Sequence, residues 1–110
     1  MGGTGVFTMF IHVFVFRWQP NVTAAQKKQV ASAIQGLQGQ VPGLLETYVG
    51  TNLSPRGMGF EFGGVMKFEN QGAFERYNSH PAHAALLGWL LPLIEPLELD
   101  FSVERPSGTT

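Results

Sequence analysis

The segment from Phe7 to Trp18 constrains the fold most, because it is apolar on both sides when it is read as a strand. Its length, its β-branched residues and its aromatic residues favour a strand over a helix. Both faces of such a strand need cover, so we expect helices on one side of its sheet and a further protein layer on the other. Alternation divides the segment into Phe10, His12, Phe14, Phe16 and Trp18 on one face and Ile11, Val13, Val15 and Arg17 on the other.

The rest of the chain predicts the order βαββαβ. Thr23 followed by Gln26 is a capping-box pattern, and Asn70 is a suitable cap for a later helix. Pro81 suits the first turn of another helical segment. The expected elements after the first strand are a helix at 23–38, strands at 44–51 and 60–68, a helix through Phe74 and Tyr77, a helix at 82–91 and a strand at 97–103.

Two local features of the expected strands can be tested directly. In the second strand, alternation sets Leu45, Thr47 and Val49 on the face opposite Leu44, Glu46, Tyr48 and Gly50. In the third strand, the Gly63-Gly64 pair predicts a bulge or a close approach of another backbone.

These elements predict an α+β fold, a ferredoxin-like sandwich in which helices cover one face of a four-stranded antiparallel sheet. Charged residues make up 14% of the chain, against about 25% in a typical soluble domain. We therefore expect a homodimer that packs two sheets face to face and buries the second apolar face. The expected boundaries are an N-terminal extension at 1–8, the domain at 9–104 and a disordered tail at 105–110.

Composition also excludes several classes of partner. The net charge is -1 and no basic patch stands out, so nucleic acid is not an expected ligand. The absence of cysteine excludes disulfides and thiolate metal sites. The apolar run from Val6 to Phe16 is too short to cross a bilayer, and no basic region precedes it, which predicts a soluble, cytoplasmic protein without membrane contact.

The segment from Tyr77 to His83 carries the chemistry most worth testing, because it holds a phenol and two imidazoles in a mostly apolar chain. His83 could act as a general base, with Tyr77 orienting it or donating to a developing enolate. The competing interpretation is that both side chains are structural. His80 precedes Pro81 and is assigned a structural role, as a helix cap or at the surface. Because no carboxylate adjoins His80 or His83 in the sequence, we expect no metal and no other cofactor.

The chain resembles the stress-responsive α/β-barrel (Dabb) domain family over residues 9–103. An early His12 lies in the opening strand, Pro42-Gly43 precedes the second strand, and Tyr77 precedes His80-Pro81-Ala82-His83. Val49-Gly50-Thr51-Asn52, Phe68 and Leu99-Asp100-Phe101 complete the ordered set. The resemblance implies a ferredoxin-like unit that dimerises through its sheet into a barrel-like core.

Members of that family include plant stress proteins, a plant polyketide cyclase that forms olivetolic acid and a plant hydroxynitrile lyase. The resemblance to the cyclase implies catalytic roles for Tyr77 and His83 and a cavity position for His12. The third-strand position where that cyclase has a cavity histidine is Phe62 in this chain. This difference argues against an identical substrate or binding mode.

The leading hypothesis from the sequence is therefore a homodimer that binds a small hydrophobic carbonyl compound and acts on it as a cyclase or lyase without a cofactor. One alternative is a stress-response oligomer with structural histidines, and another is a cofactor-free monooxygenase with the same dimeric fold. Bulky residues would line the pocket or simply fill a core. The expected substrate contacts are His12, Phe14, Phe62, Phe74, Leu87 and Trp89, and Phe16, Leu86, Leu90 and Leu91 are further candidates.

Overall fold

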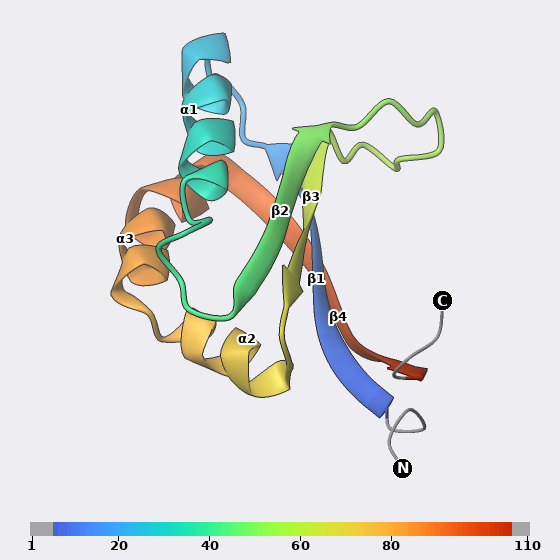
Figure 1. Ribbon diagram of the computed structural model, residues 1–110. Coiled ribbons are helices and arrows are strands. Elements are labelled where there is room, and N and C mark those ends of the chain that lie inside the picture. The colour runs from blue at the N-terminus through green and yellow to red at the C-terminus, as the bar shows by residue number, and fades with distance from the viewer. Residues whose placement is uncertain (1–5, 107–110) are drawn as a thin grey trace.

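The computed structural model describes residues 6–106, with the side chains of residues 8–104. Within that range the chain forms four strands, three α-helices and one short 3-10 helix (Figure 1). The elements in chain order are β1 (Val6–Trp18), α1 (Ala24–Gln35), β2 (Leu44–Thr51), β3 (Phe62–Phe68), α2 (Gln71–Asn78), α3 (Pro81–Leu90), η1 (Leu91–Leu93) and β4 (Ile94–Pro106).

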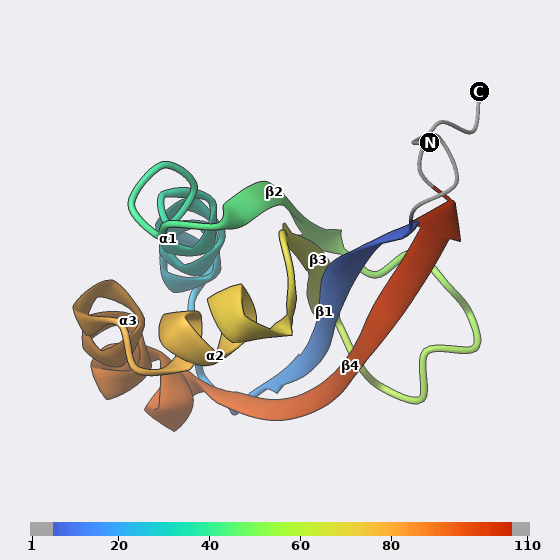
Figure 2. The same cartoon turned by 60° about the horizontal axis from the view of Figure 1, so that its bottom comes forward.

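The strands form one antiparallel sheet in the order β2-β3-β1-β4. The α-helices lie together on one side of this sheet, whereas the other side carries no helix (Figures 1 and 2). This arrangement confirms the ferredoxin-like α+β sandwich predicted from the sequence. No described helix has the length and apolar character needed to cross a bilayer.

The helices begin where the capping residues predicted. At the start of α1 the Thr23 hydroxyl accepts from the Gln26 amide, and the Gln26 side chain accepts from the Thr23 amide, which completes the capping box. Asn70 accepts from the Ala73 amide at the start of α2. α1 ends at Gln35, three residues earlier than the residue 38 expected, because the glycine-containing segment after it forms turns instead.

The expected face assignment in β2 is wrong at Leu44. A β-bulge lies between Leu44 and Glu46, so Leu44 pairs with Phe68 while Glu46 pairs with the preceding Lys67. The extra residue, Leu45, is exposed, and Leu44 turns into the core with Thr47 and Val49. The side-chain amide of Gln38 donates to the carbonyl oxygens of Leu44 and Leu45 at 3.0 and 3.1 Å, which stabilises the bulge.

The Gly63-Gly64 pair of β3 marks a close backbone approach, which is one of the two alternatives expected. A Cβ atom on Gly64 would lie 2.3 Å from the Tyr48 carbonyl oxygen and 2.7 Å from Cζ of Phe14. A Cβ atom on Gly63 would lie 2.6 Å from the Phe14 carbonyl oxygen. The register of β3 with β1 runs without interruption through both glycines, so no bulge occurs there.

The antiparallel pair of β1 and β4 extends further than the sequence predicted. β1 already begins at Val6, within the expected extension 1–8, and β4 continues through Arg105 and Pro106, within the expected tail. The reason is mutual pairing, since Val6 and Phe7 lie opposite Pro106 and Arg105. Residues 1–5 and 107–110 lie outside the described residues.

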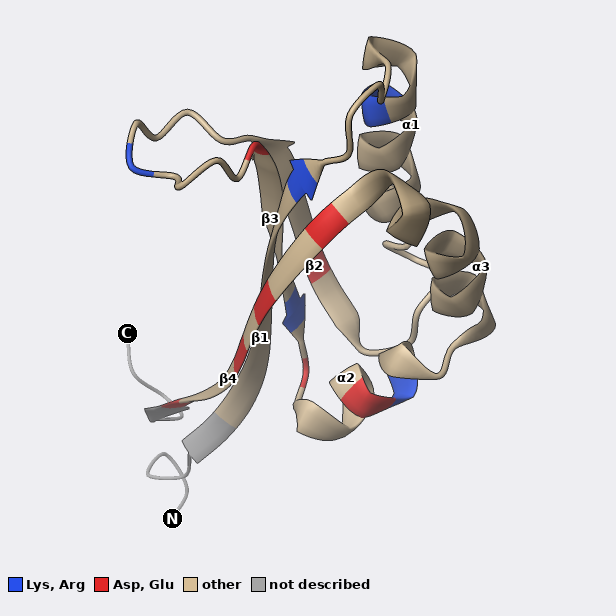
Figure 3. Cartoon of the chain, turned by 180° about the vertical axis from the view of Figure 1, so that it is seen from behind, with Lys and Arg blue, Asp and Glu red and all other residues tan. Residues whose placement is uncertain are grey.

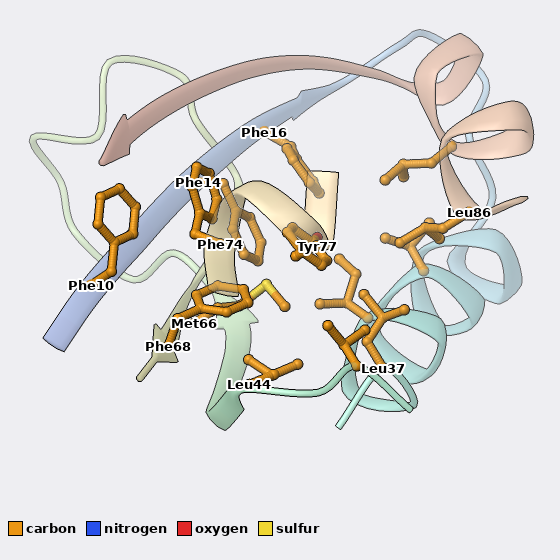
Figure 4. Close-up of a cluster of buried hydrophobic side chains, with 14 of the residues drawn as sticks. Phe10, Phe14, Phe16, Leu37, Leu44, Met66, Phe68, Phe74, Tyr77 and Leu86 are labelled. Atoms are coloured by element: carbon orange, nitrogen blue, oxygen red, sulfur yellow. The ribbon is translucent and has the colours of Figure 1, made fainter. Parts of the chain in front are cut away.

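The core lies between the sheet and the helices and is unusually rich in aromatic rings. Phe10 stacks on Phe74 at a centroid distance of 4.7 Å, and Phe68 meets the edge of Phe74 at 5.4 Å. Phe68 and Met66 are completely buried. Figure 4 shows these rings converging from β1, β3 and α2, with Leu86 of α3 approaching from the opposite side.

The opposite face of the sheet is apolar and uncovered. Leu97, Leu99 and Phe101 of β4 are 56%, 61% and 42% exposed, and Tyr48 of β2 is 55% exposed. Register places them beside Val13, Val15 and Val65. The sequence expectation that both faces of β1 are apolar is therefore confirmed, and only one of them is covered within the described part of the chain.

The close approach at Gly64 predicts a large difference between two glycine substitutions. We expect Gly64→Ala to lower the free energy of unfolding by about 1–3 kcal/mol, because the new methyl group meets the backbone of β2. Gly50→Ala is the matched control on the neighbouring strand, where an added Cβ atom meets nothing within 4 Å, and it should stay within about 0.5 kcal/mol. Urea unfolding followed by circular dichroism measures both, and equal stabilities would contradict the close approach.

Candidate functional site

A small pocket opens between the inner face of the sheet and the helices. Its volume is about 70 Å³. Its walls come from β1, α1, β3, α2, α3, η1 and β4, so every layer of the fold contributes to it. The lining is mostly apolar and comprises Phe14, Phe16, Ile34, Met66, Leu86, Leu87, Leu90, Leu91, Ile94 and Pro96, together with His12, Tyr77, His83 and Glu98.

Tyr77 and His83 meet at this pocket because the chain turns sharply between α2 and α3. Tyr77 lies in the last turn of α2 and His83 in the first turn of α3, and their ring centroids are 4.3 Å apart. His80 caps α3, with its Nδ1 accepting from the Ala82 amide at 3.0 Å. Pro81 occupies the first turn, as the sequence predicted. His80 thus has the structural role assigned to it.

The hydrogen bond of His83 determines which ring nitrogen can take a proton. Its Nδ1 lies 3.2 Å from the Asn78 carbonyl oxygen, which can only accept, so Nδ1 carries the proton and donates it. In the neutral ring Nε2 is then the basic nitrogen. Burial lowers the pKa of His83 below its ordinary value of 6.5, partly offset by the hydrogen bond to Asn78. The imidazole is therefore neutral and able to act as a base at pH 7.

Tyr77 is held in its protonated form. It is 4% exposed, and burial raises the pKa of its phenol well above the ordinary value of 10, with the charge of Glu98 adding to the effect. Within the described residues its hydroxyl makes no hydrogen bond to protein. A neutral phenol at the wall of an apolar pocket is a hydrogen-bond donor for an oxygen atom of a ligand.

His12 reaches the pocket from the sheet and pairs with an acid on the neighbouring strand. His12 and Asp100 lie opposite each other in β1 and β4, and His12 Nδ1 is 2.5 Å from Asp100 Oδ1. Glu98, two residues earlier on the same face, has Oε1 3.9 Å from His12 Nδ1. The ring of His12 lies 6.2 Å from that of Tyr77. Figure 3 shows the acidic positions following one another along β4.

The residues expected to contact a substrate fall into two groups. His12, Phe14 and Leu87 line the pocket together with Tyr77 and His83. Phe62, Phe74 and Trp89 do not: Phe62 packs against Phe16 and Trp18, Phe74 stacks on Phe10, and Trp89 packs on the outside of the core. Phe62 instead borders a second hollow, between Trp18 and the Lys27 side of α1.

The two acids of β4 were missed by sequence reasoning. Alternation in the last strand drew attention to Leu97, Leu99 and Phe101, which lie on the outer face. Glu98 and Asp100 alternate with them and therefore share the inner face with His12. The alternation of acidic and apolar residues in the last strand was visible in the sequence. Its meaning became clear only from the pairing of β4 with β1, which places Asp100 opposite His12.

His12, Glu98 and Asp100 are also the described side chains that come close to a metal-ligand set, with ligand atoms within 4.8 Å of one another. His12 Nδ1 and Asp100 Oδ1 lie 2.5 Å apart, which is within hydrogen-bonding distance. Two ligands bound at about 2.1 Å at right angles to one ion would be about 3 Å apart. The geometry present is thus that of a hydrogen-bonded pair.

Comparison with known proteins identifies the family. The family model described as the stress responsive A/B barrel domain matches residues 10–103. The chain belongs to the stress-responsive A/B barrel (Dabb) family. The resemblance drawn from the opening strand and the Tyr77–His83 segment is thereby confirmed at the level of the family. No curated protein matches the chain.

Solved structures agree with this assignment. A dimeric ferredoxin-like protein of unknown function from Thermobifida fusca is 26% identical, with a TM-score of 0.77 over 88% of this chain and 92% of that one. A Dabb family protein from Mesorhizobium loti is 26% identical, with a TM-score of 0.75 over 86% and 95%. Hydroxynitrile lyase from Passiflora edulis is 20% identical, with a TM-score of 0.81 over 86% and 93%, and shares the fold.

The electrostatics of this Dabb pocket predict the titration of His83. We expect its imidazole to titrate below pH 6.5, mainly because burial disfavours the charged form. Glu98→Gln should lower this pKa further, since the carboxylate favours the protonated ring. Two-dimensional NMR of the ring protons across pH 4–8 measures both values.

Stability should follow the same titration. A lowered pKa in the folded state means that protonation of His83 favours unfolding, so its penalty is absent above pH 6.5 and grows as the pH falls through the folded pKa. The loss of stability on acidification should be smaller in His83→Gln than in the wild type. The control for Glu98→Gln is Glu95→Gln, which removes the same negative charge from the outer face of β4. A His83 pKa above 6.5 would contradict the assignment.

Proposed function

We propose that this Dabb-domain protein is a homodimer that binds a small hydrophobic carbonyl compound in the pocket and moves a proton on it without a cofactor, as a lyase or cyclase does. The observation that carries the proposal is the pairing of a neutral imidazole with a neutral phenol, 4.3 Å apart at the wall of an apolar pocket. These are the two groups needed to form and stabilise an enolate.

His83 is the base in this proposal. Its Nε2 lone pair is free because Nδ1 donates to Asn78, and its lowered pKa keeps it unprotonated at pH 7. It removes a proton from the carbon next to the ligand carbonyl. The electron pair of the broken C–H bond forms the carbon–carbon double bond of the enolate, and the π pair of the carbonyl moves to its oxygen. The imidazolium then returns the proton to the product, so the protein ends unchanged.

Tyr77 supplies the hydrogen bond to the developing oxyanion. Its raised pKa makes it a donor that does not ionise, and its burial removes the competition of bulk water. His12 is a second group that faces the same pocket and is oriented by Asp100. We assign it to ligand positioning, because it lines the same pocket as Tyr77 and its ring nitrogen is held by Asp100.

The homodimer is proposed from the uncovered sheet face. Leu97, Leu99 and Phe101 form an apolar row that a second copy would bury by packing sheet against sheet. The Thermobifida fusca relative, which is described as dimeric, supports this proposal. The competing hypothesis of a stress-response oligomer needs the same interface, so only a chemical test separates the two.

The proton transfer can be tested before the substrate is known. Cyclopentanone is a small cyclic ketone that carries exchangeable protons next to its carbonyl. We expect the wild type to accelerate their replacement by deuterium in D₂O, measured by NMR of the ketone. His83→Gln should reduce the protein-dependent rate about a hundredfold or more, and Tyr77→Phe should reduce it by a similar factor.

His80→Asn is the control variant for this experiment. Asparagine is a good helix cap, so α3 should form normally, and His80 does not line the pocket. Its exchange rate should equal that of the wild type. If His83→Gln and His80→Asn exchange at the same rate, His83 is not the base, and the structural interpretation of the histidines is correct.

The sheet interface can be tested with one charge. Leu99→Lys places an ammonium group in the middle of the exposed row and should convert the dimer to a monomer. Leu53→Lys is the matched control, since Leu53 is 90% exposed in the loop between β2 and β3. Sedimentation equilibrium measures the mass of each. A Leu99→Lys variant that remains dimeric would place the interface elsewhere.

A further inference from the structure

The charges at the pocket are unequally distributed. Among the described side chains, the acid that lines the pocket is Glu98 of β4, and Asp100 of the same strand lies next to it. None of the described lysines and arginines lines the pocket. The ion pair between Lys67 and Glu46 lies on the outer face of the sheet.

The two acids are not equivalent. Asp100 is held by a direct hydrogen bond to His12 at 2.5 Å. Glu98 has only the longer contact of 3.9 Å with the same ring, and its side chain is 56% exposed. Glu98 therefore lies at the mouth of the pocket, where its carboxylate is exposed to solvent and can contact the polar end of a ligand.

The field of Glu98 reaches the groups assigned to chemistry. It faces His12 from β4, and its charge acts on both Tyr77 and His83 across the pocket. The lining between these groups is apolar, with Phe14 directly opposite Glu98 in the strand register. An apolar wall lowers the local dielectric constant, so a charge on a ligand would feel this carboxylate more strongly than it would in open water.

We propose that Glu98 selects ligands by charge, so that the pocket takes an apolar group whose end at the β4 mouth is cationic and excludes one that ends in a carboxylate. This inference rests on the proposed function only in that the same pocket binds a small molecule. The proposal defines the substrate class further. The ligand is a hydrophobic carbonyl compound whose end facing β4 carries an ammonium group or, at the least, no anionic group.

A series of ligands with one common ring tests the inference by binding alone. Cyclopentylamine, cyclopentanone and cyclopentanecarboxylate present a cation, a neutral carbonyl and an anion on the same five-membered ring. NMR titration of the ring resonances of Tyr77 and His83 gives each dissociation constant at pH 7.5. We expect the amine to bind about tenfold more tightly than the carboxylate at low ionic strength, and the ratio to shrink as salt is added.

Variants at Glu98 identify the source of the preference. In Glu98→Gln the ratio should fall to about threefold or less, because Asp100 alone remains, and in Glu98→Lys it should reverse in favour of the carboxylate. Glu95→Gln is the matched control: it removes one charge from the same strand but on the outer face, and it should keep the wild-type ratio. The exposure of Glu98 means that these substitutions leave the core intact.

The outcomes separate this inference from the proposed chemistry. If Glu98→Gln keeps the full preference for the amine, or if none of the ligands perturbs the Tyr77 and His83 resonances, the inference is wrong. If the preference follows Glu98 but cyclopentanone undergoes no protein-dependent exchange, charge selection stands and the proton-transfer function falls. If cyclopentanone exchanges but the ligands show no charge preference, the proton-transfer function stands and charge selection by Glu98 is wrong.

Discussion

The structure depends on one strand that is hydrogen-bonded along both of its edges. β1 pairs with β3 along one edge and with β4 along the other, so its backbone donors and acceptors are satisfied on both sides. Its inner side chains anchor the aromatic core, and its outer side chains belong to the apolar sheet face. The neighbouring strands complete its hydrogen bonding, and the helices cover its inner face.

The pocket follows from that arrangement and from the turn between α2 and α3. His12 is oriented by the sheet, because its partner Asp100 lies opposite it in the strand register. Tyr77 and His83 are oriented by helix ends, one closing α2 and the other beginning α3. Groups held by secondary structure rather than by loops keep their relative positions, which a proton-transfer site requires.

The two faces of β4 differ in polarity and serve different parts of the structure. Its outer leucines and Phe101 belong to the uncovered apolar face, whereas Glu98 and Asp100 face the pocket. A strand can do this because successive side chains point to opposite faces. The same alternation explains why a chain with few charges still carries a concentrated negative field at one site.

The sequence by itself determined the order of the elements, the helix caps at Thr23 and Asn70, and the family, because these depend on local residue patterns. Tyr77 and His83 could be paired from the sequence, since only a short turn separates them. Only the tertiary structure decided that Leu44 is buried through a bulge, that Phe62 and Phe74 fill the core, and that Asp100 and Glu98 face His12. Those outcomes depend on strand register across a long separation in the chain, which no local pattern encodes.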